Sequence, residues 1–199
     1  YVGTGVVIKI LHRAGTIQTS AKFAGGIVAR VDGTSISTTT ATIDRCWSSV
    51  EINSTVNGDG THGGILAHQN TGSLTISNSL FDGKLLGNLT FNCGGIVGWR
   101  ENNSKLSVSK VLFAPQSVTI NTSGSYTFFR NSTNVSYYQM YDCFYTQRFG
   151  TSQGSSVSSS AQDQQAKLGD NWTVQDNKCV PLMVKDFFSI KSSEDWDAF

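Results

Sequence analysis

A pattern that recurs along the chain at a nearly constant spacing constrains the fold more than any other feature of the sequence. Four copies place an apolar residue at the same point of a segment rich in Ile, Val, Leu, Thr and Ser: Ile43, Ile76, Val108 and Met140. The spacings between these residues are 33, 32 and 32. An earlier, partial copy is indicated by residues 15–17, which align with residues 83–85. A fixed period in this range is typical of repeat architectures, in which successive units stack on one another.

The pattern within each copy predicts strands rather than helices. Short runs rich in β-branched and aromatic residues are separated by Gly, Asn, Asp and Ser, and no long window before residue 160 has a helical period. A repeat of this length with three short strands corresponds to one rung of a parallel β-solenoid, whose rungs stack at about 4.8 Å. We therefore predict an all-β fold, a right-handed parallel β-helix of about four to five rungs over residues 1–146, with the hand that parallel crossovers almost always have.

Stacking of the rungs predicts columns of equivalent side chains inside the coil. One column would contain the four residues that define the repeat. A second would contain Trp47, Leu80, Leu112 and Phe144. A third would contain Ile27, Ile65, Ile96 and Phe128. Antiparallel pairing between the strands around Ile76 and Val108 would contradict this arrangement.

A pair of glycines precedes one strand of each copy, at residues 25–26, 63–64 and 94–95. One of these stretches, "NCGGIVGW" at 92–99, superficially resembles a phosphate-binding loop, but the residues that follow do not begin a helix, which such a loop requires. We predict instead that the glycines form corners of the coil with positive φ, where the missing Cβ atoms also avoid clashes between stacked rungs. Tyr126 and Thr127 take their place in the last copy.

The segment after the repeats, residues 147–183, is predicted to be a loop followed by a cap. A solenoid end exposes unpaired strand groups and an open core, which natural proteins cover. The Ser-rich run at 155–160 is expected to be a mobile loop, and a short helix is expected near Ala161–Leu168. Trp172 and Val180–Met183 should then return to cover the last rung.

Both ends of the sequence indicate a piece of a longer polypeptide. The first residues, "YVGTGVVIKI", already resemble the middle of a rung. Residues 184–199 are expected to be a linker and the start of a following module, because Ser193 precedes acidic residues as a helix N-cap does. Neighbouring modules of the same polypeptide are therefore expected partners.

The composition is typical of an exported surface module. Charged residues make up 15% of the chain and the net charge is +1, so no basic stripe indicates binding to nucleic acid or to an anionic membrane. No apolar run is long enough to span a bilayer, which argues against direct membrane insertion. We expect the protein to be secreted or located at a cell surface, although its export signal and anchor would lie outside this sequence.

Several motifs resemble a known family. The recurring "GGIVG" with "LTISNS.F.G.L", the closing "CFYTQ" with "GTSQG", the string "LGDNWTVQDNKCVPLM" and the terminal "EDWDAF" are similar to the GLUG-like repeat proteins of bacterial cell surfaces. The resemblance covers nearly the whole chain. It implies a module of a long secreted or surface-attached adhesin, built from tandem β-solenoid units and without shared catalytic residues.

A carbohydrate-active enzyme is the main alternative, because polysaccharide lyases and hydrolases also adopt parallel β-helices. Such enzymes need paired carboxylates on one face, or a basic residue beside a bound Ca²⁺. The predicted columns align Asp44 and Asp82 with neutral residues of the neighbouring rungs, and Asp32 and Asp59 are interpreted as turn formers. The three histidines have no carboxylate or cysteine at ligand spacing. We therefore predict no catalytic residue, metal or cofactor.

Ice binding is a third class, since solenoids can display ladders of threonine. The column that begins at Thr42 continues with Thr75, Ser107 and Gln139. A ladder interrupted in this way is not expected to order water.

The positions that differ between rungs are the candidates for ligand binding. Just past each Gly-Gly strand stand residues with unlike side chains: Arg30, His68, Trp99 and Asn131. An exposed Trp99 beside Arg100 would offer a flat apolar face with a polar edge. We expect host or microbial glycans, or surface proteins, as partners of a patch made by Arg30, His68, Trp99 and Arg100. The alternative is that these turn positions vary because nothing constrains them, and the module is then a passive stalk.

The four cysteines are expected to be free thiols. Cys46 and Cys143 occupy the same repeat position three rungs apart, about 14 Å by strand spacing, whereas a disulfide needs Cα atoms within about 7 Å. Cys93 has no partner at its own corner. Cys143 with Cys179 is the one pair left open.

Overall fold

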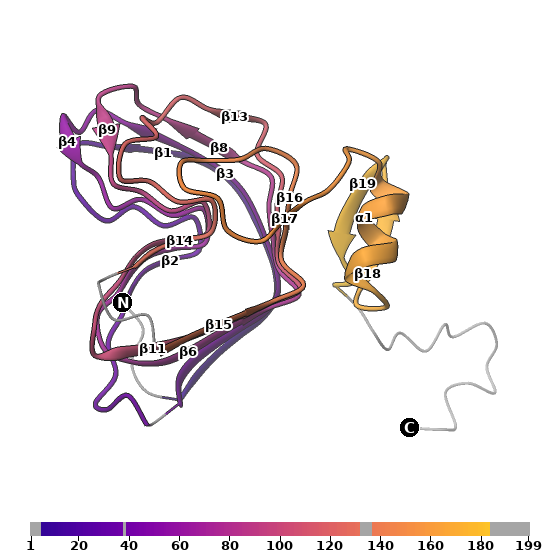
Figure 1. The fold of residues 1–199 in the computed structure, drawn as a ribbon, viewed down its shortest axis with the longest axis horizontal. Helices are drawn as coiled ribbons and strands as arrows, with labels where there is room; N and C mark the ends of the chain where they lie inside the picture. The colour runs from indigo at the N-terminus through magenta and orange to yellow at the C-terminus, as the bar shows by residue number, and fades with distance from the viewer. Residues whose placement is uncertain (1–4, 38, 132–136, 184–199) are drawn as a thin grey trace, which may run out of the picture.

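The computed structural model describes residues 5–37, 39–131 and 137–183. The part of the chain expected to begin a following module, residues 184–199, lies outside these ranges. In Figure 1, which looks almost along the solenoid, successive turns overlie one another, and the C-terminal elements lie beside the stack.

The described chain forms a parallel β-solenoid of about four turns. Its second sheet shows the turns most clearly, because each turn contributes one strand: β2 (Val28–Val31), β5 (Leu66–Gln69), β10 (Val97–Arg100) and β14 (Phe129–Asn131). The larger, 11-stranded sheet contains β1 (Val6–Thr19), β3 (Thr39–Ser54), β6 (Gly72–Ser77), β7 (Leu80–Phe81), β8 (Lys84–Leu86), β11 (Ser104–Ser109), β12 (Leu112–Phe113), β13 (Ser117–Val118), β15 (Tyr138–Tyr141), β16 (Phe144–Tyr145) and β17 (Ser155–Ser156). The short strands β4 (Gly58–Asp59) and β9 (Thr90–Phe91) pair with each other.

The predicted register is confirmed. Ile43 pairs with Ile76, Ile76 with Val108 and Val108 with Met140, in each case in parallel. The partial first copy is also present, since Ile8 pairs with Ile43 and Ile17 with Ile52. The interrupted threonine column is confirmed by the same strand pairs.

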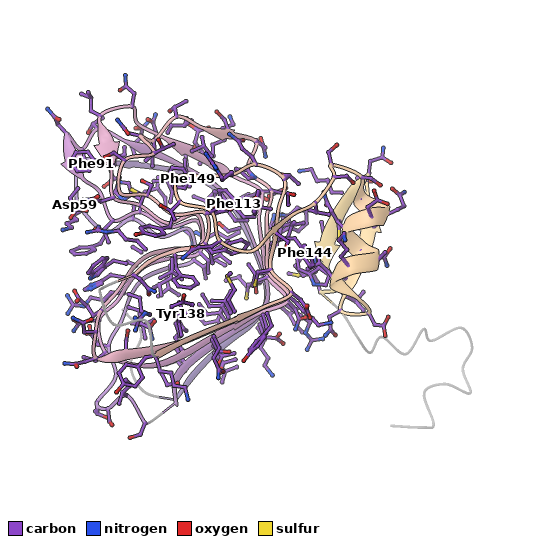
Figure 2. All side chains as sticks on the ribbon, in the orientation of Figure 1. Asp59, Phe91, Phe113, Tyr138, Phe144 and Phe149 are labelled. Atoms are coloured by element: carbon purple, nitrogen blue, oxygen red, sulfur yellow. The ribbon has the colours of Figure 1, made fainter. Side chains whose placement is uncertain are left out.

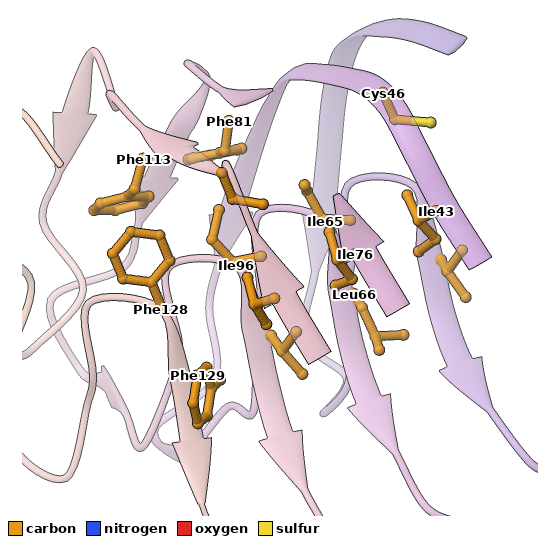
Figure 3. Close-up of a cluster of buried hydrophobic side chains, with 14 of the residues drawn as sticks. Ile43, Cys46, Ile65, Leu66, Ile76, Phe81, Ile96, Phe113, Phe128 and Phe129 are labelled. Carbon is orange, nitrogen blue, oxygen red and sulfur yellow. The ribbon is translucent and has the colours of Figure 1, made fainter. Parts of the chain in front are cut away.

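The core consists of side chains stacked inside the coil (Figure 3). Ile43, Ile76, Ile65 and Ile96 are fully buried there, as the column predictions require. The rings of Phe81 and Phe113 stack with centroids 5.8 Å apart, and Phe149 continues the stack at 6.5 Å from Phe113.

The predicted column of Trp47, Leu80, Leu112 and Phe144 exists, but the prediction that it faces the inside is wrong. Its members pair in register, yet they pack in a separate cluster on the outer flank of the coil. Alternation explains the difference, because Phe81 and Phe113, the next residues along their strands, point inward. Figure 2 shows Phe144 on the side of the coil that faces the helix and Phe113 within the coil.

That outer column is covered by the C-terminal segment, residues 157–182, which we call the lateral cover. It contains α1 (Ala161–Leu168) and an antiparallel hairpin of β18 (Trp172–Gln175) and β19 (Lys178–Pro181). Leu168, Trp172 and Val180 pack against the flank. The helix has the predicted bounds, and Ser160 caps it by accepting a hydrogen bond from the Asp163 amide. The expected cap therefore runs along the side of the solenoid rather than across its end.

The last turn is closed by the residues that precede the cover. Phe149 is buried under the last rung. The side-chain amide of Gln153 makes hydrogen bonds with the backbone of the last turn, as a further strand would. Its Oε1 accepts from the amides of Phe128 and Phe129, while its Nε2 donates to the carbonyl of Phe129. The Ser-rich run, expected to be a mobile loop, is structured in part, since Ser155–Ser156 forms β17 and pairs with β16.

The glycine pairs serve close packing, not positive φ. Positive φ values occur at other glycines. A Cβ on Gly95 would instead overlap the carbonyl oxygen of Thr127 in the next turn, and one on Gly64 would overlap the ring of Phe81. The prediction of positive φ at the glycine pairs is therefore wrong. The prediction that the missing Cβ atoms avoid clashes is confirmed, because these residues lie too close to neighbouring atoms to carry a side chain.

The left-handed corners of the solenoid are occupied by other residue types. One corner follows the first strand segment of each turn and has φ between 45° and 55° at Ile10, Arg45, Asn78, Lys110 and Asp142. A second corner lies two residues before the glycine pairs, at Phe23, Thr61 and Asn92. A corner of this kind costs about 1–2 kcal/mol at a non-glycine residue, which the stacked ladder around it offsets.

The four cysteines are free thiols and all are buried. Burial raises the pKa of Cys93, Cys143 and Cys179 to about 12. Cys143 belongs to the core of the coil, whereas Cys179 packs under the lateral cover. No helix among the described residues is long and apolar enough to cross a bilayer.

Candidate functional site

The predicted ligand-binding residues lie on neighbouring strands of the four-stranded sheet. Arg30 on β2 pairs with His68 on β5, and His68 pairs with Trp99 on β10, so these three residues form one column as expected. Asn131 does not continue it, because a register shift aligns Asn131 with Arg100. Arg130 lies against Trp99 instead.

Arg100, the fourth predicted residue, is not at the surface. Its side chain is fully buried. Nε donates to Asn131 Oδ1 at 2.6 Å, and Nη1 donates to the carbonyl of Ser104 at 2.7 Å. Successive residues of a strand point to opposite faces, so Trp99 and its neighbour cannot share a surface. The prediction that Arg100 contributes to an exposed patch is wrong, and its role is to join β10 to the next segment.

A cleft of about 230 Å³ opens at the column of His68 and Trp99. It draws residues from all four turns, and we call it the four-turn cleft: Lys22, Phe23, Thr61, His68, Trp99, Glu101 and Arg130.

Rings and cations stack along the solenoid axis within this cleft. The rings of Phe23 and His68 are stacked with centroids 4.8 Å apart, which is the spacing of adjacent turns. The guanidinium of Arg130 lies 4.1 Å from the centroid of the Trp99 ring, and Lys22 lies over Phe23 at 5.4 Å. Lys22, Phe23 and His68 thus form one stack, and Trp99 with Arg130 forms a second.

Asp59 accepts hydrogen bonds from both cations of the cleft, Lys22 and Arg130. Its Oδ2 accepts from Lys22 Nζ at 2.9 Å, and its Oδ1 accepts from Arg130 Nη1 at 3.0 Å. Thr61 Oγ1 donates to the same Oδ1 at 2.8 Å. Burial would raise the pKa of the Asp59 carboxyl, but the hydrogen bonds from Lys22 and Thr61 and the charge of Arg130 outweigh burial, so the pKa lies below its ordinary value. Asp59 is therefore ionised and committed to its partners at neutral pH.

His68 and Glu101 form the other polar pair. His68 Nε2 lies 3.4 Å from Glu101 Oε1, and His68 is 5% exposed. Burial lowers the pKa of His68 more than the hydrogen bond and charge of Glu101 raise it, so the imidazole is neutral at pH 7 and donates from Nε2 to the carboxylate. Its Nδ1 is buried and has no hydrogen-bond partner among the described residues. Glu101 is more open, with 39% of its side chain exposed.

Two carboxylates at this site were missed or misjudged from the sequence. Asp59 is part of β4 rather than a turn former, and its contact with Arg130 spans 71 residues. Glu101 stands 33 residues from His68, one turn away, a spacing that a search for ligands close in sequence does not consider. The repeat period was the available signal, because groups one period apart are neighbours in a solenoid.

No group of three or more His, Cys, Asp or Glu side chains that could hold an ion occurs among the described residues. Glu101 and Asp59 both accept hydrogen bonds from protein donors. The arrangement is suited to polar and stacking contacts with a ligand.

Comparisons with known proteins give one similarity of fold. No family model matches the sequence, and no match is found among curated proteins. The crystal structure of a "putative immunoglobulin A1 protease" from Bacteroides ovatus is similar, with a TM-score of 0.57 and 17% sequence identity. The match covers 87% of this chain and 57% of that chain, so the present chain spans little more than half of its length. At this identity the likeness shows a shared fold alone.

Proposed function

We propose that this chain is a non-catalytic repeat module of a bacterial secreted or cell-surface protein, of the GLUG-like type, and that its four-turn cleft binds glycans. One observation carries the proposal: four consecutive turns contribute flat rings, cations and a solvent-facing carboxylate to a single cleft. In a passive stalk, the same positions would be unrelated solvated turns.

The chemistry of the cleft supports a carbohydrate ligand. Sugars present apolar C–H faces together with hydroxyl groups that both donate and accept hydrogen bonds. Trp99 and Phe23 offer apolar surface with polar neighbours, and the exposed carboxylate of Glu101 can accept from hydroxyls. A surface protein is the other partner class, and it would present the same groups on a broader area.

A glycan array tests the proposal. The wild-type module should bind a defined subset of glycans, and Trp99→Ala should lose that binding. Tyr141→Ala is the matched control, since Tyr141 is an exposed aromatic residue on β15 in the other sheet, and it should bind as the wild type does. Circular dichroism melting confirms that both variants are folded. An array without any bound glycan would overturn the proposal.

A carbohydrate-active enzyme is the second candidate, because Glu101 lines the cleft and Asp59 binds two of its lining residues, Lys22 and Arg130. Glycoside hydrolysis uses a pair of carboxylates. The engagement of Asp59 with three donors speaks against it. Incubation with bound polysaccharides distinguishes the two: release of reducing ends that Glu101→Gln abolishes would establish the enzyme, and a binding module should release none.

A further inference from the structure

We propose that the ligand of the four-turn cleft is an acidic glycan whose sugar carboxylate binds to Arg130. The inference rests on the proposed glycan-binding function and adds the class of sugar. It begins from the way in which the structure holds the Arg130 guanidinium.

Arg130 is fixed through one of its nitrogens. Nη1 donates to Asp59 Oδ1 at 3.0 Å and to the carbonyl of Asn92 at 2.9 Å, and it lies 3.4 Å from Thr61 Oγ1. The plane of the guanidinium is set by the ring of Trp99, 4.1 Å away. The side chain is 17% exposed, so it is held in one orientation at the wall of the cleft.

The other edge of the guanidinium is available to a ligand. Among the described residues, Nε and Nη2 of Arg130 have no hydrogen-bond partner, whereas Nη1 has three. Nε–H and Nη2–H are the parallel donors that bind the two oxygens of a carboxylate at once. An orientation fixed in advance reduces the entropy lost when such a bond forms.

The remaining polar groups of the cleft suit the rest of an acidic sugar. The side chain of Lys22 is 44% exposed, and both Lys22 and Arg130 form salt bridges with Asp59. Two positive charges are therefore balanced by one negative charge at this wall of the cleft. Across the cleft, Glu101 receives one long hydrogen bond from His68 and can accept from sugar hydroxyls. A ligand with a carboxylate at one end and hydroxyls beside it satisfies both sides, whereas a neutral sugar leaves the donor edge of Arg130 without a charged partner.

Polygalacturonate and its fully methyl-esterified form provide a matched pair of probes, because esterification removes the charge of the sugar carboxyl and adds only a methyl group. The wild-type module should bind the acid at least about tenfold more tightly than the ester, the effect of one charge-assisted hydrogen-bonded contact. Arg130→Gln should remove this preference. Arg130→Lys should restore it in part, since lysine keeps the charge without the paired donors. Lys105→Gln, an exposed charge change on β11, should leave the preference intact.

The outcomes separate this inference from the proposed function. Equal affinity for acid and ester would overturn the acidic-sugar proposal while glycan binding stands. Equal affinity for polygalacturonate and dextran sulfate would also overturn the acidic-sugar proposal, because Nε–H and Nη2–H of Arg130 would then bind anions in general. If the wild type binds neither these probes nor any array glycan, the proposed function fails as well.

Discussion

Lys178 on β19 places its Nζ 2.8 Å from Oδ2 of Asp82, a carboxylate that is 5% exposed on the flank of the second turn. The other oxygen of Asp82 accepts from Trp47 Nε1 at 2.7 Å and from Ser49 Oγ at 2.6 Å. One carboxylate therefore joins two turns of the solenoid to the lateral cover. Asn171 and Lys110 add two further polar links between cover and coil.

Asp82→Ala should lower the free energy of unfolding by about 2–3 kcal/mol, because hydrogen bonds to a charged, buried acceptor are lost and their donors remain. Urea denaturation followed by circular dichroism measures the change. Glu51→Ala removes the salt bridge between Lys84 and Glu51, which is more exposed, and should cost less than about 1 kcal/mol. Equal effects of the two substitutions would contradict the role assigned to Asp82.

Removal of the lateral cover should leave a folded but aggregating solenoid. A chain ending at residue 156 keeps Phe149 and Gln153, which close the last turn, but it exposes the column of Trp47, Leu80, Leu112 and Phe144. Size-exclusion chromatography with light scattering should show concentration-dependent oligomers. The same truncation with Leu80→Gln and Leu112→Gln should be monomeric. A monomeric truncation without these changes would show that the cover does not protect the flank.

The repeat period predicted the register of the turns but not the face to which a column points. Leu80 and Leu112 in one column and Phe81 and Phe113 in the adjacent column are all apolar, and a shift of one residue exchanges inside and outside. Only the cover, which follows all the turns in the sequence, explains why the outer column is apolar. In the same way, Arg100 and Trp99 differ by one position, and one is buried while the other lines the cleft.

The role of the glycine pairs and the contact between Asp59 and Arg130 depend on backbone and side-chain geometry that the residue types alone do not predict. The glycine pairs indicated corners, but their sequence does not distinguish a positive φ from a close approach between turns, and the second is correct. The bond from Asp59 to Arg130 depends on side-chain reach across two turns. Helix α1, in contrast, follows from a local signal, the N-cap Ser160 before a polar helical run, and its bounds were predictable.

Gly95→Ala should destabilise the fold by about 2–3 kcal/mol, the upper part of the range for overpacking in a close-packed interior. The added Cβ would overlap the carbonyl of Thr127, which belongs to the backbone ladder and cannot move away alone. Gly5→Ala is a control with open space around the added atom. It should cost only the strain of its positive φ of 80°, about 1–2 kcal/mol. Thermal and urea unfolding of both variants give the comparison. A larger loss for Gly5→Ala would contradict the packing explanation.

His62 should make stability depend on pH. Burial lowers its pKa from the ordinary 6.5 to about 4, and its Nδ1 accepts a hydrogen bond from the Ala24 amide, which a protonated ring could not do. Between pH 6.5 and 4, His62 is therefore protonated in the unfolded chain and neutral in the folded chain. Stability should be complete above pH 6.5 and should fall toward pH 4, by up to about 1.4 kcal/mol per pH unit.

The contribution of this histidine is isolated by comparison with His62→Asn, which does not titrate. The difference in unfolding free energy between wild type and variant should shrink as the pH falls from 6.5 to 4. A difference that stays constant over this window would show that His62 is not held neutral in the folded protein.

The most direct test of the central claim, that the four-turn cleft binds the glycan, is an ¹H–¹⁵N spectrum of the tryptophan indole N–H groups during titration with an oligosaccharide chosen from the array. Trp99→Phe identifies the signal of the cleft tryptophan. That signal should shift saturably, while those of Trp47, which donates to Asp82, and Trp172, which is buried under the cover, should stay in place. A bound oligosaccharide that leaves the Trp99 signal unmoved, or that shifts Trp47 and Trp172 instead, would contradict the assignment of the cleft as the binding site.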